Sequence, residues 1–280
     1  MTTMRPHIGP LEPEPAATMP TDRSASREAA RTPREPASGA LRFARFAFRP
    51  NALGYCGGEA PGELFDRVVA DADDPDLHRL CGEFAGARPY LELLAQAPGA
   101  QGPLDPAVVE AYWVGGPILQ ALRPQAFQAD LERRVRPRGT DSDWRWLAGK
   151  PAQGAVPHHA FHVLEIYPRL GLTGDGSRDA LLATMERCLV RPAQVVGRES
   201  DELLVVARPL VVQDGTLCFG EERPERILAA IDDRGFVDAA QPGDWIAVHW
   251  GWACDVLTLD RYAALETANG AAVTLAARTI

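Results

Sequence analysis

The pattern of apolar and polar positions changes once along the chain, close to residue 187. Between residues 41 and 186 the apolar side chains recur at intervals of three and four residues, which is typical of amphipathic helices. From residue 187 onward they form short β-branched runs separated by turn residues, which is typical of strands. The pattern predicts an α+β protein, with a mainly α-helical domain over residues 41–186 and a small OB-like β-barrel with a C-terminal helix over residues 187–280.

Several start signals for helices lie in the first domain. Asp74-Pro75 and Asp105-Pro106 each combine an N-cap residue with a proline at the first helical position. Ser177 is expected to cap a helix that runs to about residue 187. Residues 158–168 also predict a helix, which Pro168 is expected to end because proline cannot continue an α-helix.

Strand and turn signals divide the second domain. Cys188 is expected to head the first strand. Asp214-Gly215 lies between two short apolar runs and predicts a tight hairpin. Residues 243–250 predict a further strand, and Thr258 is expected to cap the closing helix.

Residues 1–40 differ from the rest of the chain in composition. They are rich in Pro, Ala, Arg, Glu and Ser and contain few large apolar residues. Such a segment cannot bury enough surface to offset its chain entropy. We therefore expect a disordered leader.

Charge and cysteine content narrow the class of protein. The net charge of −9 and the isoelectric point near 5.2 argue against a nucleic-acid surface and against an anionic membrane as partner. No apolar run approaches the roughly 18 residues needed to span a bilayer. The 5 cysteines are odd in number and form no CxxC pair, so we expect no disulfide framework and a location in the cytoplasm.

The motifs of common enzyme classes are missing from the sequence. It contains no P-loop, no GxSxG elbow and no kinase signature. The expectation is a protein that is not an enzyme.

Two segments of the second domain carry a family resemblance. The first runs from Cys188 to Pro192. The second, over residues 241–266, contains Gly243, Asp244, Trp245, Val248, His249, Gly251, Trp252 and Ala253. Together and in this order, they resemble the HypC/HupF family of NiFe-hydrogenase assembly chaperones. The chain departs from the family in carrying its cysteine far from the N-terminus and in having Ala193 where the family has Gly.

The resemblance implies a carrier of an iron fragment. Members of the family hold an Fe(CN)2CO fragment together with the iron–sulfur protein HypD and pass it to the large-subunit precursor of the hydrogenase. The residues carried over as transient ligands of the iron are Cys188 and His249. A thiolate is a soft ligand that suits iron bearing cyanide and CO, and imidazole suits iron as well.

A second group of candidate metal ligands lies in the helical domain. His158 and His162 are one turn apart on the predicted helix and so are expected to share a face, and His159 adjoins His158 in the sequence. Glu165 lies one turn beyond His162, and Cys56 lies in a glycine-rich turn. Both are candidate helpers of a metal at this cluster.

Three functions remain open at this point. The first is an accessory protein of hydrogenase maturation, whose helical domain recognises a HypD-like protein or the large-subunit precursor. The second is a metal-dependent enzyme that uses the histidine cluster, and the third is a metal-free scaffold. Cys81 and Cys218 are expected to be structural. Cys254 lies five residues after His249 and is the weakest of the candidate metal ligands.

Overall fold

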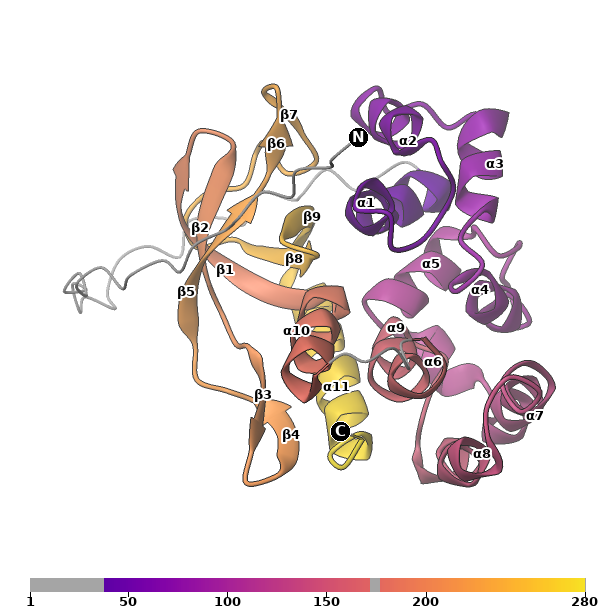
Figure 1. Ribbon diagram of the computed structural model, residues 1–280. Helices are drawn as coiled ribbons and strands as arrows, with labels where there is room; N and C mark the ends of the chain where they lie inside the picture. The colour runs from indigo at the N-terminus through magenta and orange to yellow at the C-terminus, as the bar shows by residue number, and fades with distance from the viewer. Residues whose placement is uncertain (1–37, 172–176, 280) are drawn as a thin grey trace, which may run out of the picture. The chain divides into compact units, whose positions relative to one another are not determined.

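Helices precede strands along the chain, as the change in pattern predicts. The computed structural model describes residues 38–171 and 177–279, and Figure 1 shows the helices from α1 to α10 followed by strands and a last helix. The α+β class is thus confirmed. The helices end and the strands begin within a few residues of the predicted boundary, although the division into two separately folding domains stays a prediction.

The helical segment consists of short helices, and three of its predicted start signals are confirmed. The side chain of Asp74 accepts from the N–H of Leu77, and those of Asp105 and Ser177 cap α5 and α10 in the same way. The helices are α1 Gly39–Ala52, α2 Pro61–Val69, α3 Pro75–Gly82, α4 Arg88–Leu94, α5 Pro106–Trp113, α6 Pro117–Ala121, α7 Pro124–Arg134, α8 Asp141–Leu147, η1 Pro151–Gln153, α9 His159–Phe161, η2 His162–Gly171 and α10 Arg178–Cys188.

The predicted disordered leader overlaps the first helix. Residues 1–37 lie outside the described residues. Ser38 caps α1, which begins at Gly39. The leader therefore ends at least two residues earlier than predicted.

Five strands of the second segment close on themselves. Strand β1 pairs antiparallel with both β2 and β8, which gives the closed order β1-β2-β5-β9-β8. The resemblance of this barrel to an OB fold stays a prediction. The strands are β1 Arg191–Glu199, β2 Glu202–Ala207, β3 Leu210–Gln213, β4 Thr216–Phe219, β5 Arg223–Leu228, β6 Ala230–Ile231, β7 Arg234–Gly235, β8 Trp245–His249 and β9 Trp252–Leu257.

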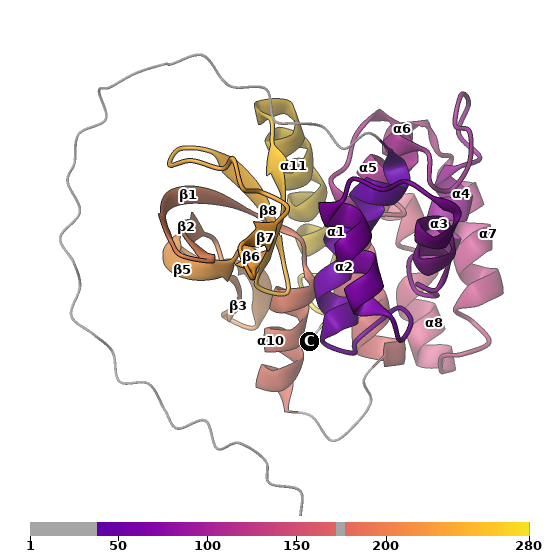
Figure 2. The ribbon, with the colours of Figure 1, turned by 90° about the horizontal axis from the view of Figure 1, so that it is seen from above.

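The predicted hairpin and closing helix are both present. Strands β3 and β4 pair around Asp214 and Gly215, which both have the positive φ of a two-residue hairpin turn. Thr258 caps α11, Leu259–Leu275, which contacts β1 and β9 of the barrel (Figure 2).

Two local predictions are wrong. Cys188 does not head a strand, because it is the last residue of α10 and β1 begins at Arg191. Pro168 does not end a helix, because it lies inside the π-helix η2. A π-helix pairs residues five apart, so proline is accommodated without the clash with the i−4 carbonyl that ends an α-helix.

Helix α1 packs against the barrel strands β8 and β9. Asp255 on β9 is 2% exposed and accepts from Arg45 of α1 at 2.9 Å and from Arg261 of α11 at 2.8 Å. Nearby, the ring of Phe48 on α1 lies edge-on to Trp252 at 5.2 Å. One buried carboxylate and an aromatic cluster thus join three elements that are distant in sequence.

No helix in the described part of the chain is long and apolar enough to cross a lipid bilayer.

Substitution of Asp255 tests this buried ion pair. Asp255→Ala removes the buried carboxylate that pairs with Arg45 and Arg261, so we expect the free energy of unfolding to fall by about 3–5 kcal/mol, measured by urea denaturation. The control is Glu92→Ala, which removes an exposed ion pair with Arg88 and is expected to cost less than about 1 kcal/mol. A loss for Asp255→Ala no larger than that of the control would contradict the structural role of this carboxylate.

Candidate metal centre

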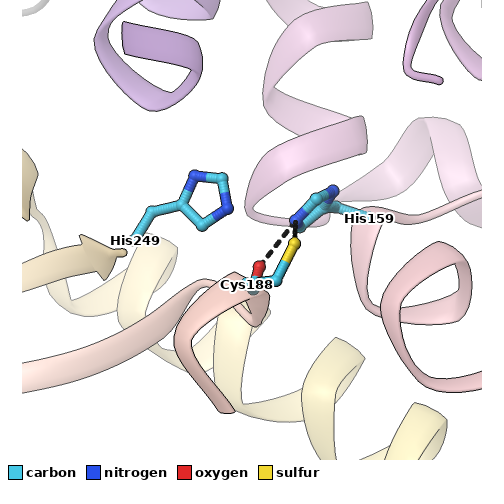
Figure 3. Close-up of side chains that lie close together, drawn as sticks. All are labelled: His159, Cys188 and His249. Atoms are coloured by element: carbon cyan, nitrogen blue, oxygen red, sulfur yellow. Dashed lines mark hydrogen bonds between the residues drawn. The ribbon is translucent and has the colours of Figure 1, made fainter. Parts of the chain in front are cut away.

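Three side chains that can bind a metal ion lie together where the helical segment meets the barrel. They are His159, Cys188 and His249, and their ligand atoms all lie within 4.8 Å of one another (Figure 3). His159 comes from α9, Cys188 from the end of α10 and His249 from the end of β8. The cluster therefore exists only because three separate segments pack together.

Each of these residues lies at an end of its element. His159 is the first residue of α9, which the side chain of His158 caps by accepting from Ala160 N–H at 3.1 Å. Cys188 is the last helical residue before Leu189 turns to an extended conformation. His249 is the last residue of β8, before the chain turns into β9.

The imidazole of His249 is oriented as a metal ligand. Its Nδ1 lies 2.8 Å from the carbonyl oxygen of Phe46, so Nδ1–H donates there and Nε2 carries the lone pair. His249 is 1% exposed, and its Nε2 makes no hydrogen bond of good geometry to the described residues, although the backbone of Cys188 lies close enough to offset part of the fall in the pKa of this imidazole. Metal-binding histidines commonly have their other ring nitrogen bonded to a carbonyl in this way.

His159 has partners for both ring nitrogens. Its Nε2 lies 2.8 Å from the carbonyl oxygen of Cys188 and 4.0 Å from the Sγ atom of that residue. Its Nδ1 lies 3.2 Å from the hydroxyl of Tyr112. With a metal ion on Nε2, the ring proton of His159 would be on Nδ1. The hydroxyl oxygen of Tyr112 would then accept a hydrogen bond from this N–H group. The hydroxyl can serve either tautomer, because it both donates and accepts.

Aromatic rings surround the two imidazoles. The ring of Trp113 lies 4.5 Å from that of His159 and 5.5 Å from that of His249. The ring of Phe46 stacks on that of Trp113, with centroids 5.4 Å apart. The ligands therefore lie in surroundings of low polarity, which disfavour every charged form.

Burial shifts the pKa of all three ligands. It lowers the pKa of His249 to about 4 and that of His159 well below its usual value. It raises the pKa of the Cys188 thiol to about 12. The imidazoles are therefore neutral and ready to bind a metal at pH 7, whereas Cys188 gives up its proton only to the metal itself.

The remaining members of the predicted histidine cluster point to other partners. His158 caps α9 and so lies outside the helix, while His162 lies against the hydroxyl of Tyr90 at 3.4 Å. The predicted shared face of His158 and His162 is not formed, because the regular α-helix that it requires is replaced by a cap and a π-helix. The structure thus brings His159 alone of the three to the metal centre.

Glu165 and the other cysteines do not join the three ligands either. Glu165 is 1% exposed and pairs with Lys150 at 2.6 Å. Cys56 is exposed in the loop between α1 and α2. Cys81 and Cys254 are buried in the core and Cys218 is half-buried on β4.

Sequence reasoning selected all three side chains as candidate ligands but did not group them. It placed Cys188 and His249 at one site and His159 at another. Spacing could not join them, since the three residues lie on elements whose contact depends on the tertiary fold. Tyr112 and Trp113 were missed as neighbours of the centre, because nothing in their local sequence separates them from core residues.

The buried histidines predict a dependence of stability on pH. Burial lowers the pKa of His158, His162 and His249 to about 4, against 6.5 for an unperturbed histidine, and that of His159 further. The unfolded chain then binds more protons than the folded chain, so stability is full above pH 6.5 and falls as the pH drops toward 4.

Urea denaturation in the presence of a chelator measures this slope. We expect the free energy of unfolding to decrease by at least about 1.4 kcal/mol per pH unit between pH 6.5 and 5, the equivalent of one proton. A free energy that stays constant over this range would show that the buried imidazoles do not resist protonation.

Comparison with known families accounts for nearly the whole described chain. The profile of DUF6390, described as a family of unknown function, matches residues 35–280. Comparison with curated proteins and with solved structures gave no match. The match spans the helical segment and the barrel together, and the chain belongs to the DUF6390 family.

Proposed function

We propose that this protein is a metal-binding accessory protein of NiFe-hydrogenase maturation that carries the Fe(CN)2CO fragment at His159, Cys188 and His249. The observation that carries the proposal is the convergence of these three ligands within 4.8 Å. Two of them, Cys188 and His249, are the residues that the resemblance to the HypC/HupF family selects. They come from opposite ends of the barrel sequence, yet they lie together.

The donor set suits the proposed cargo. One thiolate and two neutral imidazoles are ligands that iron accepts, and the thiolate is the soft donor that cyanide-bearing and CO-bearing iron favours. Iron of this kind takes six ligands. Two cyanides and one CO occupy three positions, which leaves three for the side chains of the protein. The number of ligands in the cluster matches the number of positions left free.

The affinity of Cys188 for its proton favours release of the metal. Because burial raises the pKa of Cys188 to about 12, a proton competes strongly with the metal for the sulfur. A carrier has to give up its cargo, and this competition weakens its hold. We therefore favour delivery over permanent storage.

The helical segment has a part in this function. His159 lies on α9, so the barrel by itself lacks one of the three ligands. We propose that the helical segment also recognises the partner, a HypD-like maturation protein or the hydrogenase large-subunit precursor. This transfer would take place in the cytoplasm, where the unpaired state of the described cysteines is the normal one.

One observation favours a second candidate function, that of a metalloenzyme. Catalytic zinc sites use three protein ligands and keep a fourth position open for water. The cluster of His159, Cys188 and His249 has this number of ligands. The identity of the bound metal distinguishes the two functions, because cyanide and CO accompany iron only in the carrier.

Substitution of Cys188 tests the carrier role. Protein purified from cells that assemble NiFe hydrogenase is expected to show the infrared stretching bands of cyanide and CO. Cys188→Ala is expected to remove both bands and to stop hydrogenase maturation, since it deletes the only thiolate of the cluster. Cys218→Ala, on the barrel-associated hairpin, is the control and is expected to keep them. Full hydrogenase maturation with Cys188→Ala would refute the role.

Substitution of the histidines tests which imidazoles bind the metal. His159→Ala and His249→Ala are each expected to lower the affinity for Zn(II) by at least about tenfold, measured by competition with a coloured chelator. His162→Ala removes a buried imidazole of similar surroundings that does not belong to the cluster, and it is expected to bind Zn(II) like the unaltered protein. Equal losses in all three variants would point to general destabilisation and against the assigned ligands.

A further inference from the structure

A pocket of about 510 Å³ opens between α8, the π-helix η2 and the residues just beyond α11. None of the three candidate metal ligands lines it. Pockets of this volume commonly accommodate a small organic molecule. The lining side chains are polar apart from one indole, and they are Ser142, Asp143, Arg145, Trp146, Arg169 and Thr279.

A buried carboxylate holds one wall of this pocket in place. Glu165 is 1% exposed, and its Oε2 accepts from the indole N–H of Trp146 at 2.6 Å. Its Oε1 lies 2.6 Å from Nζ of Lys150, which is 5% exposed. The two buried charges offset each other, so the positive charge of Arg169 beside them remains available to a ligand.

Arg169 is fixed with one edge of its guanidinium group uncommitted. Its Nη1 donates to Oγ1 of Thr279 at 2.6 Å and to the carbonyl oxygen of Glu165 at 3.1 Å, and its Cζ lies 4.5 Å from the centre of the Trp146 ring. Within the described ranges, its Nε and Nη2 make no hydrogen bond. These two atoms form the edge that binds two oxygens of a carboxylate or phosphate side by side.

Arg145 adds a second cation to the pocket. Its side chain is exposed and forms neither a hydrogen bond nor an ion pair with the residues that the structure describes. The opposing charge is that of Asp143, whose Oδ2 already accepts from the backbone N–H and the hydroxyl of Thr140 at 2.9 and 2.6 Å. With two arginines against one aspartate, the lining is positively charged although the whole chain has a net charge of −9.

The conformation of the wall is a second observation, independent of charge. Glu165 and Arg169 both belong to η2, a π-helix of 10 residues. The π-helical conformation is rare in proteins and occurs frequently at functional sites. Its presence at the residues that hold the pocket wall favours a binding function for the pocket.

We propose that this pocket binds a small oxyanion, the phosphate or carboxylate group of a soluble molecule, through the guanidinium groups of Arg145 and Arg169. Arg169 binds two of its oxygens with the Nε and Nη2 edge, and Arg145 contacts the same group from the exposed side. Ser142 adds a hydroxyl donor at the rim. The site is independent of the metal-binding function proposed above.

Titration of the isotope-labelled full chain with inorganic phosphate, and separately with succinate, tests the site by NMR. At about 0.1 M NaCl the Debye length is about 10 Å, so distant charges contribute little. We expect a saturable shift of the Trp146 indole N–H resonance with at least one of the two anions. A response to phosphate alone would identify a phosphate-bearing ligand, and a response to succinate alone a carboxylate.

Substitutions show whether the two arginines bind the anion. Arg145→Gln is expected to weaken binding by at least about fivefold, because it removes charge-assisted hydrogen bonds. Arg169→Lys keeps the charge but loses the planar fork, and a similar loss is expected. The control is Arg138→Gln, which removes the same charge from an exposed arginine outside the pocket and is expected to change the affinity by less than about twofold.

Three results would overturn the proposal. The first is the absence of a saturable shift with either anion up to about 10 mM. The second is an unaltered affinity in Arg145→Gln, a change confined to an exposed side chain, with a native spectrum. The third is an equal loss in Arg145→Gln and Arg138→Gln, because the anion would then respond to the net charge of the surface and not to this pocket.

Discussion

The contact of helix α1 with strands β8 and β9 is the constraint on which the candidate metal centre depends. The carbonyl oxygen of Phe46 on α1 fixes the tautomer of His249, and Asp255 on β9 binds Arg45 of the same helix. Without this contact, His249 would lie at the end of strand β8 without the carbonyl that binds its Nδ1. The helical segment therefore does more than flank the barrel, since it orients one ligand and supplies His159. The match of a single family to both segments agrees with this interdependence.

Burial gives the centre its chemical character. Apolar and aromatic surroundings keep both imidazoles neutral and keep the thiol of Cys188 protonated, so the centre carries no charge before a metal binds. A divalent ion bound there would displace one proton from Cys188 and leave a single net positive charge, which anionic ligands such as cyanide could offset. A site of this kind distinguishes the ion by its preference for sulfur and nitrogen donors.

Local signals in the sequence were sufficient to predict many helices and turns, but they were not sufficient to predict the candidate metal centre. Short-range chemistry placed the helix starts at Asp74 and Ser177 and the hairpin turn at Asp214, because caps and tight turns depend on adjacent residues. Prediction failed at Pro168, where a π-helix replaces the α-helix that proline would end. The candidate ligands were recognised as residue types in two groups. The three side chains come together only because the ends of α9, α10 and β8 pack against one another. No local sequence pattern encodes that packing.

X-ray absorption spectroscopy of the protein loaded with one equivalent of Zn(II) tests the central claim most directly. The account predicts a coordination shell with two imidazole nitrogens at about 2.0 Å and one sulfur at about 2.3 Å, from His159, His249 and Cys188. A shell of nitrogen and oxygen alone would contradict it, because the ion would then lie away from Cys188.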